Sequence, residues 1–301
     1  MEPVFGGQSM VAPLRRVLMR RPDESFSVTE PGKWHYTGTP DLERALSEHD
    51  TFRQILGNLG VETKMHDEPL PGLADAIYVF DPALITDAGA ILLRMGKRLR
   101  QGEEAALGRI FKKHGIPLLG RLSEPATAEG GDMFWIDRNT LAVGIGFRTN
   151  REGVRQIEQL LRPFHINILT ADLPYFQGPE ACLHLLSLIS LVDDRLAVVY
   201  KPLFPVALFQ ELEKRGFEFI EVPEEEFPTM GCNILTVAPG VCVMLEGNPV
   251  TRSRIEERGC RVYTYRGNEI SLKAEGGPTC LTRPLLRDTG APPDESRGQL
   301  K

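Results

Sequence analysis

The sequence lacks several features that would place it in a specialised class. Its five cysteines are odd in number and none has CxxC spacing, which argues against a disulfide framework and a structural zinc site. No apolar run approaches the length of a membrane span, and no apolar signal-peptide core stands near the N-terminus. We therefore expect a cytoplasmic protein that has no membrane partner.

Basic stripes interleaved with aromatic residues are also missing, and the formal net charge is -6. Nucleic acid is therefore not an expected partner. With 301 residues, of which 42% are hydrophobic and 25% charged, the chain is ordinary for a soluble globular protein with a sizeable core. The last segment, residues 288–301, is rich in Gly, Pro and charge, so we expect a disordered, solvated tail.

Most of the cysteines are expected to be core residues. Cys182, Cys242 and Cys260 stand in apolar runs, where cysteine behaves as a small hydrophobic residue. Cys280 differs because it follows the stretch Ala274–Thr279, which contains a glycine pair. A backbone of this kind can present a thiolate to a substrate.

A pattern of apolar strand, polar helix and apolar strand recurs five times. The five passes run over Leu14–Met65, Ala90–Leu119, Leu141–Thr170, Leu196–Val222 and Val241–Tyr265. Such a pattern is typical of a βαβ unit, in which the helix returns the chain to lay down a parallel strand. Further apolar runs lie between the passes: Ile77–Ile85, Met133–Ile136, Leu185–Val192, Ile234–Ala238 and Leu281–Leu286. Each unit is therefore ββαβ, and we predict one closed array of five units forming a single α/β domain over residues 1–287.

Residues with chemical potential stand just before or within the additional strands. They are Asp81, Asp132, His184, Asn233 and Cys280. If the units surround an axis, equivalent positions converge on it. The repeat therefore predicts a central site where carboxylates, an imidazole and a thiol meet.

Four ordered motifs resemble the guanidino-group-modifying enzymes of the pentein superfamily, which are arginine deiminases, dimethylarginine dimethylaminohydrolases and amidinotransferases. The motifs are Glu129–Asp132 (EGGD), Gly146–Asn150, Leu183–Leu185 and Gly276–Cys280, and the opening Ala12–Pro22 is similar too. The resemblance covers nearly the whole chain. It implies a five-bladed α/β-propeller, in agreement with the repeats.

The resemblance also implies catalytic roles. A guanidinium carbon is a poor electrophile because its charge is delocalised, so it needs a strong nucleophile and carboxylates that hold it. Cys280 would attack this carbon to give a covalent amidino-thioether. His184 would protonate the leaving nitrogen and then activate water. Glu129 would orient His184 or the guanidinium, and no cofactor or metal is implied.

Substrate-binding residues are implied in the same way. The segment Asp75–Ala83 resembles a dimethylaminohydrolase segment in which a first aspartate contacts an α-amine and a Glu-Asp pair holds the guanidinium. Asp75 and Asp81 match, whereas Phe80 replaces the glutamate, which leaves room for an apolar ω-substituent or marks a different guanidino compound. The further substrate contacts expected are Arg100 and Arg148 at an α-carboxylate, together with Asp132 and Glu275.

Each of these assignments has a structural alternative. Arg100 ends a basic run, Lys97–Arg100, that could be a solvated face, and Asp132 could hold its turn together. His184 could be a buried core histidine, although its equivalence to the other positions favours catalysis.

Deiminases and amidinotransferases usually carry an aspartate two residues after the histidine, where this chain has Leu186. The leading hypothesis is therefore a cysteine-dependent hydrolase that converts arginine or ω-methylated arginine to citrulline. An amidinotransferase and a non-catalytic binding protein, like the ribosome anti-association factor of the same fold, are the rivals. The guanidino substrate is the expected partner, and a homodimer is left open.

Overall fold

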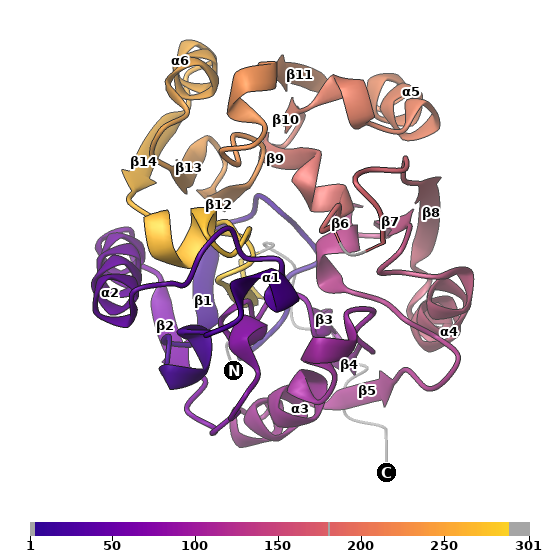
Figure 1. Ribbon diagram of the computed structural model, residues 1–301. Coiled ribbons are helices and arrows are strands. Elements are labelled where there is room, and N and C mark those ends of the chain that lie inside the picture. The colour runs from indigo at the N-terminus through magenta and orange to yellow at the C-terminus, as the bar shows by residue number, and fades with distance from the viewer. Residues whose placement is uncertain (1–3, 180, 289–301) are drawn as a thin grey trace.

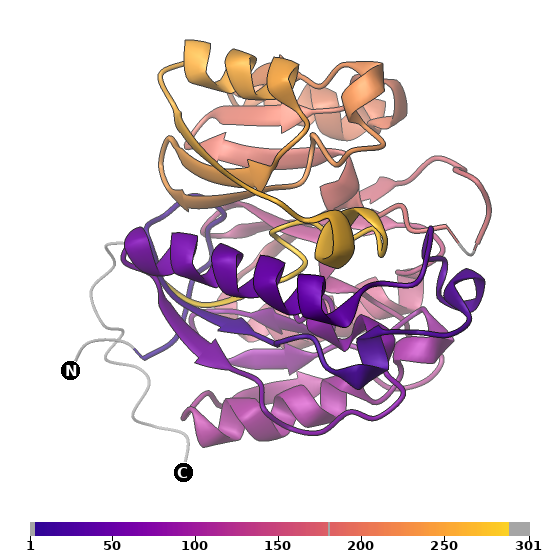
Figure 2. The same ribbon diagram turned by 60° about the vertical axis from the view of Figure 1, so that its left-hand side comes forward.

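The computed structural model describes residues 4–179 and 181–288, in which five three-stranded sheets surround a central axis with helices on the outside (Figures 1 and 2). In each sheet the inner pair of strands is antiparallel, and the second pair is parallel and joined by a helix. The predicted ββαβ unit and the five-bladed α/β-propeller are thereby confirmed.

Four sheets follow the chain order. They contain β3 (Ala83–Ile85), β4 (Ala90–Leu92) and β5 (Leu118–Arg121); β6 (Met133–Asp137), β7 (Thr140–Ile145) and β8 (Asn167–Asp172); β9 (Ile189–Asp193), β10 (Leu196–Val199) and β11 (Glu218–Glu221); β12 (Ile234–Ala238), β13 (Val241–Leu245) and β14 (Arg261–Tyr265). The main helices are α2 (Leu42–Asn58), α3 (Glu103–Lys113), α4 (Arg151–Leu161), α5 (Val206–Lys214) and α6 (Pro249–Glu257).

The remaining sheet joins the two ends of the chain and closes the ring. Its order is β15 (Arg283–Arg287), β1 (Leu14–Met19) and β2 (Glu62–Met65). β15 is antiparallel to β1, with Leu14 opposite Arg287 and Leu18 opposite Arg283. The last strand therefore completes the first blade.

Helix α4 illustrates why these segments become helices. The side chain of Asn150 caps its start by accepting a hydrogen bond from the Gly153 N–H at 2.7 Å, which satisfies one of the free donors of the first turn. Val154, Ile157 and Leu161 are buried, and their spacing places them on one face of a helix. This face packs on the sheet, and the polar face is exposed.

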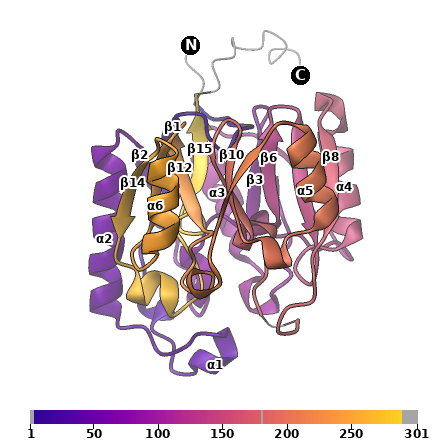
Figure 3. The ribbon, with the colours of Figure 1, turned by 90° about the horizontal axis from the view of Figure 1, so that it is seen from above.

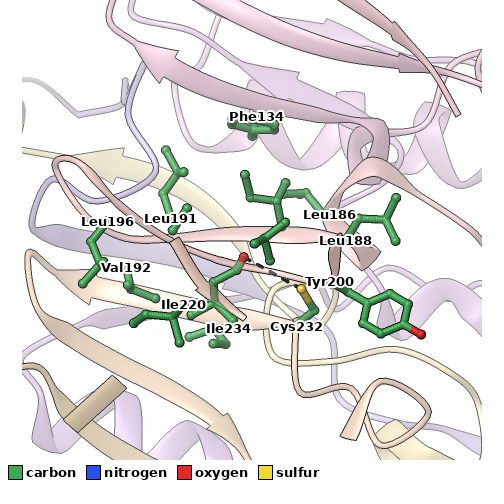
Figure 4. Packing of buried hydrophobic residues seen from close by; sticks show 14 of the residues in the cluster. Phe134, Leu186, Leu188, Leu191, Val192, Leu196, Tyr200, Ile220, Cys232 and Ile234 are labelled. Atoms are coloured by element: carbon green, nitrogen blue, oxygen red, sulfur yellow. Dashed lines mark hydrogen bonds between the residues drawn. The ribbon is translucent and has the colours of Figure 1, made fainter. Parts of the chain in front are cut away.

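The first strands of the sheets surround the axis and bury its core. Figure 4 shows one part of this core, where Leu191 and Val192 of β9 pack near Leu196 of β10 and Ile234 of β12. Of the three cysteines predicted to be core residues, Cys242 and Cys260 are buried in this cluster. Cys182 is not, because it lies in a loop beside the candidate active site.

Two predicted strands are shorter than expected because turns occupy the first parts of these segments. In Ile77–Ile85 only β3 is a strand, preceded by a 3-10 turn at Ala74–Ile77. In Leu185–Val192 the strand β9 follows a 3-10 turn at Leu185–Ser187. The predicted tail, apart from Asp288, lies outside the described residues. Among the described helices, none has the length and apolar character needed to cross a membrane.

Candidate active site

A cavity lies beside the short helix α1 (Pro31–Trp34), because Trp34 and His35 belong to its lining. Figure 3 shows α1 at one end of the propeller. The walls of the cavity bring together most of the predicted site residues from different blades. The lining residues are Trp34, His35, Asp75, Tyr78, Asp81, Lys97, Arg100, Glu129, Arg148, Cys182, His184, Ala274, Glu275, Gly276 and Cys280. Ionisable groups dominate this list.

An imidazole–carboxylate pair lies at the centre of the site. His184 Nε2 is 2.7 Å from Glu129 Oε2, and both side chains are buried. The other carboxylate oxygen of Glu129 accepts the backbone N–H of Lys97 at 2.8 Å and lies 3.7 Å from Arg148 Nη1. Glu129 therefore holds the His184 ring in a defined orientation.

Electrostatics favour the charged form of both partners. Burial alone would raise the pKa of Glu129, but the His184 hydrogen bond and the His184 and Arg148 charges lower that pKa below its usual range. Burial opposes an imidazolium, yet the pKa of His184 is raised well above its ordinary value by Cys182, Asp81 and Asp132 around it. The pair is an ion pair at neutral pH, with a proton that His184 can donate.

Asp81 is held by a second ion pair. Its Oδ1 accepts the Gly131 N–H at 3.0 Å, and its Oδ2 accepts Arg100 Nη1 at 2.5 Å. Arg100 also donates from Nε and Nη2 to Glu103 and from Nη2 to the Tyr78 carbonyl. Arg100 is buried, so it is not the solvated charge considered above, and most of its donors are used inside the protein. This arrangement favours positioning of Asp81 over binding of a substrate carboxylate.

Asp75 forms an ion pair with Lys97, the first residue of the basic run Lys97–Arg100. Its Oδ2 accepts Lys97 Nζ at 2.6 Å, and its Oδ1 accepts the Tyr36 hydroxyl at 2.7 Å. Lys97 Nζ also donates to the Trp34 carbonyl at 2.9 Å. Asp75 and Lys97 thus connect the cavity wall to helix α1.

The thiol of Cys280 lies in a tightly built loop. Gly276 packs so closely on the Tyr78 ring that a Cβ atom there would clash with it, and Glu275 before it has φ 57°. Asn233 fixes the end of the loop, since its Oδ1 accepts the Thr279 N–H at 3.1 Å and its Nδ2 donates to Cys280 Sγ at 3.4 Å. Burial raises the pKa of Cys280 to about 12, while the His184 charge lowers it.

Two predicted contacts do not line the cavity. The Phe80 ring packs in the core with the Arg283 guanidinium 3.6 Å from its centroid, because the backbone turn that directs Asp81 inward places the preceding side chain on the opposite side. Asp132 accepts the Thr149 hydroxyl at 2.6 Å and the Leu185 N–H at 3.0 Å. It therefore supports the segment that carries His184, as its structural alternative anticipated.

Arg148 and Glu275 line the cavity, as the resemblance implied. Sequence reasoning missed Cys182, whose Sγ is 3.5 Å from His184 Nδ1, and Lys97. The signal for Cys182 was its position two residues before the histidine. For Lys97 no signal stood in the sequence, because its partner Asp75 is distant along the chain.

Some of these groups have the geometry of metal ligands. Ligand atoms of Asp81, Glu129 and His184 all lie within 4.8 Å of one another. However, Asp81 is already paired with Arg100, and Glu129 with His184. The charges of these residues are therefore balanced by their ion pairs, without a metal ion. The expectation that the site holds no metal stays a prediction.

The fold and the site together define a member of the pentein superfamily of guanidino-group-modifying enzymes. The family model described as N,N dimethylarginine dimethylhydrolase, eukaryotic, matches residues 33–287. The chain belongs to this family and is a hydrolase that acts on C–N bonds.

Several known proteins are similar to this chain. The N(G),N(G)-dimethylarginine dimethylaminohydrolase of Pseudomonas aeruginosa is 28% identical over 249 residues, covering 82% of this chain and 91% of that enzyme. An arginine deiminase of Listeria welshimeri is 26% identical over 263 residues, covering 73% of this chain and 63% of the deiminase.

Solved structures share the fold. A mutant of the Pseudomonas aeruginosa enzyme complexed with citrulline aligns with a TM-score of 0.74 at 24% identity, covering 90% of this chain and 98% of that one. The amidinotransferase SxtG of Microseira wollei aligns with a TM-score of 0.79 at 16% identity, covering 95% and 98%. At these identities the likeness shows the fold alone.

Proposed function

We propose that the protein hydrolyses the guanidino group of arginine or ω-methylated arginine, giving citrulline and ammonia or the corresponding amine. The observation that carries this proposal is the joining of three groups on one cavity: the thiol of Cys280, the His184–Glu129 ion pair and the carboxylate of Asp81. Together they supply a nucleophile, a proton donor and an acceptor for a guanidinium.

The positive charge of the substrate would favour ionisation of the Cys280 thiol. With its pKa raised to about 12, the Cys280 thiol is protonated at neutral pH. A guanidinium bound beside it brings a positive charge, which favours the thiolate and lowers that pKa. Asp81 and Glu129 can each accept further hydrogen bonds, because a carboxylate oxygen has two acceptor positions. Binding and activation of the nucleophile are therefore coupled.

The reaction is then a pair of displacements at one carbon. The Cys280 thiolate adds to the guanidinium carbon, and the C–N bond to the terminal nitrogen breaks as His184 gives that nitrogen its proton. Ammonia or the methylated amine leaves. The now neutral His184 takes a proton from water, whose oxygen adds to the same carbon. The C–S bond then breaks as the added hydroxyl group loses its remaining proton to solvent, which releases the neutral ureido product and regenerates the Cys280 thiolate.

Arg148 is the residue we assign to the α-carboxylate. It lines the cavity and is buried, with Nη1 3.7 Å from Glu129. A guanidinium fork is suited to a carboxylate. Asp75 carries the opposite charge to Arg148, and we assign it to the α-amine of the substrate. The ion pair with Lys97 holds the side-chain carboxylate of Asp75 in place.

A panel of guanidino compounds tests the function. Purified protein is incubated with arginine, monomethylarginine, dimethylarginine and agmatine, and the ureido product and the released amine are measured together, with Cys280→Ser as the control. We expect equal amounts of both products from at least one amino-acid substrate and none from the variant. Turnover of no compound would overturn the proposal.

Amidino transfer is a second activity to test at the same site, since the same thiol could pass an amidino group to an amine. Its support is the structural likeness to SxtG, which concerns the fold alone. Adding an amine acceptor to the arginine assay separates the two activities. A new guanidino product together with ornithine would indicate transfer, whereas unchanged citrulline formation would support hydrolysis.

A further inference from the structure

Behind the active site, a second cavity lies on the propeller axis and is lined by two buried arginines. Residues of all five inner strands form its walls, and its volume is about 30 Å³. Arg283 and Arg287 on β15 enter it four residues apart, and this even spacing places both side chains on one face of the strand. Their exposed fractions are 5% and 3%.

Among the described residues, no carboxylate forms an ion pair with either arginine. Arg287 donates to the carbonyl oxygens of Ala12 at 2.7 Å and Thr236 at 2.9 Å. Arg283 stacks on Phe80 and donates from Nη1 to the Ala83 carbonyl, while its buried Nε has no hydrogen-bond partner. Asp81 is the carboxylate whose charge acts on Arg283, but its Oδ2 is bound to Arg100.

The cavity remains positively charged at neutral pH. Burial lowers the pKa of both Arg283 and Arg287 to about 9, which still leaves the two guanidinium groups protonated at pH 7. Buried charges in proteins are ordinarily paired, because removal from water is costly. Two adjacent cations without an ion-pair partner are therefore an unusual lining for a buried cavity.

The hydroxyl groups around the cavity are neutral, so they leave its positive charge unchanged. Ser190 donates to the Cys232 carbonyl, Thr236 to the Leu191 carbonyl and Thr279 to the Ile234 carbonyl. The protons of these three hydroxyls are used. Ser9, a fourth hydroxyl residue of the lining, accepts the backbone N–H groups of Val11 and Ala12. The charged donors left for an occupant belong to the guanidinium groups, including Arg283 Nε.

We propose that this axial cavity binds one small monovalent anion, of the halide class, between Arg283 and Arg287. The volume has room for an occupant about the size of a single water molecule, which excludes sulfate, phosphate and an amino acid. The anion would supply the missing negative charge and accept the free guanidinium donors.

An occupant here would support the active site from behind. The Phe80 ring lies against Arg283, while the Phe80 backbone N–H donates to the Cys280 carbonyl at 3.2 Å. Asp81 follows directly in the chain. Anion binding would therefore stabilise the contact between β15 and the segment that leads into β3.

Halide-dependent stability tests the site without using enzyme activity. Thermal unfolding of the full chain is measured at constant ionic strength while gluconate is replaced by chloride or bromide. A ligand that binds only the folded state raises the melting temperature with its concentration, and we expect a rise of a few degrees. Arg283→Met should abolish this dependence, whereas Arg151→Ala, at an exposed arginine paired with Asp172, should retain it.

Diffraction from wild-type crystals grown in bromide decides the matter even if Arg283→Met does not fold. We expect an anomalous peak between the two guanidinium groups. A cavity containing only water, or a melting temperature of the wild type that is indifferent to halide, would overturn the proposal.

Discussion

The two cavities on the propeller axis differ in how their buried charged side chains are partnered. At the active-site end, cations and carboxylates alternate as the pairs Lys97–Asp75, Arg100–Asp81 and His184–Glu129. In the cavity behind, Arg283 and Arg287 have carbonyl oxygens as hydrogen-bond acceptors and no carboxylate partner among the described residues.

The difference is instructive because both cavities lie on the same axis, the front one lined by loops and turns and the rear one mainly by the inner strands. Paired charges hold their geometry in the absence of ligand, and their carboxylates keep acceptor positions for a cationic substrate. Unpaired charges gain from an added partner of opposite sign. The front cavity is thus suited to a guanidinium and the rear cavity to an anion.

The largest expected effect compares an arginine from each cavity. Arg100→Leu leaves Asp81 and Glu103 buried without their cation, and we expect the free energy of unfolding to fall by about 3–5 kcal/mol. Arg283→Met removes a cation that no carboxylate pairs, so in gluconate buffer the expected loss is on the order of 1 kcal/mol. Chemical denaturation at pH 7 measures both. Equal losses would break the comparison.

Replacing the proton donor tests whether the front pairs serve catalysis. His184→Asn should lower kcat/KM by a factor of about 100 or more, because a general acid–base residue is lost. The folded fraction, followed by circular dichroism, should stay close to the wild type. His165→Asn, at an exposed histidine with φ 54°, is the control. Normal turnover by the folded fraction of His184→Asn would make His184 a structural residue.

A buried histidine away from both cavities gives a pH-dependent effect of intermediate size. Burial lowers the pKa of His49 to about 4 from 6.5, and neither ring nitrogen has a hydrogen-bond partner. The unfolded chain therefore binds more protons between pH 6.5 and 4, so the stability contribution is present above pH 6.5 and is lost as pH falls through this window.

Comparison with a variant isolates this contribution from other titrating groups. Between pH 7 and pH 5 the wild type should lose about 2 kcal/mol more than His49→Leu. Denaturant unfolding at the two pH values measures the difference, and His165→Asn should behave like the wild type. An identical pH dependence for His49→Leu would show that His49 does not titrate on unfolding.

The smallest expected effect concerns substrate selection. Arg148→Ala should raise KM for arginine by about tenfold, because a charged hydrogen-bond partner of the α-carboxylate is lost. Agmatine, which has no carboxylate, should be affected much less. Arg98→Ala, at an exposed position of the basic run, is the matched control. Equal changes for both compounds would remove Arg148 from carboxylate recognition.

The periodic part of this structure could be predicted from the sequence. Because equivalent positions of a closed repeat meet at its axis, residues as distant as Asp81 and Cys280 could be placed together before any coordinates were known. Turn boundaries were harder to predict. In the segments before β3 and β9 the apolar pattern continues through 3-10 turns, so periodicity alone made these strands too long.

Side-chain direction and pairing could not be predicted. Phe80 and Asp81 are neighbours in the chain, yet the Phe80 side chain lies in the core and the Asp81 side chain lies in the active site. A small rotation of the backbone decides which of the two side chains faces the site. The partners of Lys97 and Arg100 depend on which loops the ring brings together. For Arg283 and Arg287 a signal did exist: two arginines at even spacing within the predicted apolar strand Leu281–Leu286 and the residue after it.

The most direct test of the account is the mass of a trapped intermediate on Cys280. The enzyme is quenched with acid during turnover of arginine, and the peptide that contains Cys280 is analysed by mass spectrometry, with Cys280→Ser as the control. Hydrolysis predicts an adduct that keeps the whole arginine skeleton less one ammonia, because the terminal nitrogen leaves first. An adduct of only the amidino carbon and its two nitrogens would instead indicate amidino transfer. An adduct on Cys182, or turnover by the Cys280→Ser variant, would contradict Cys280 as the nucleophile.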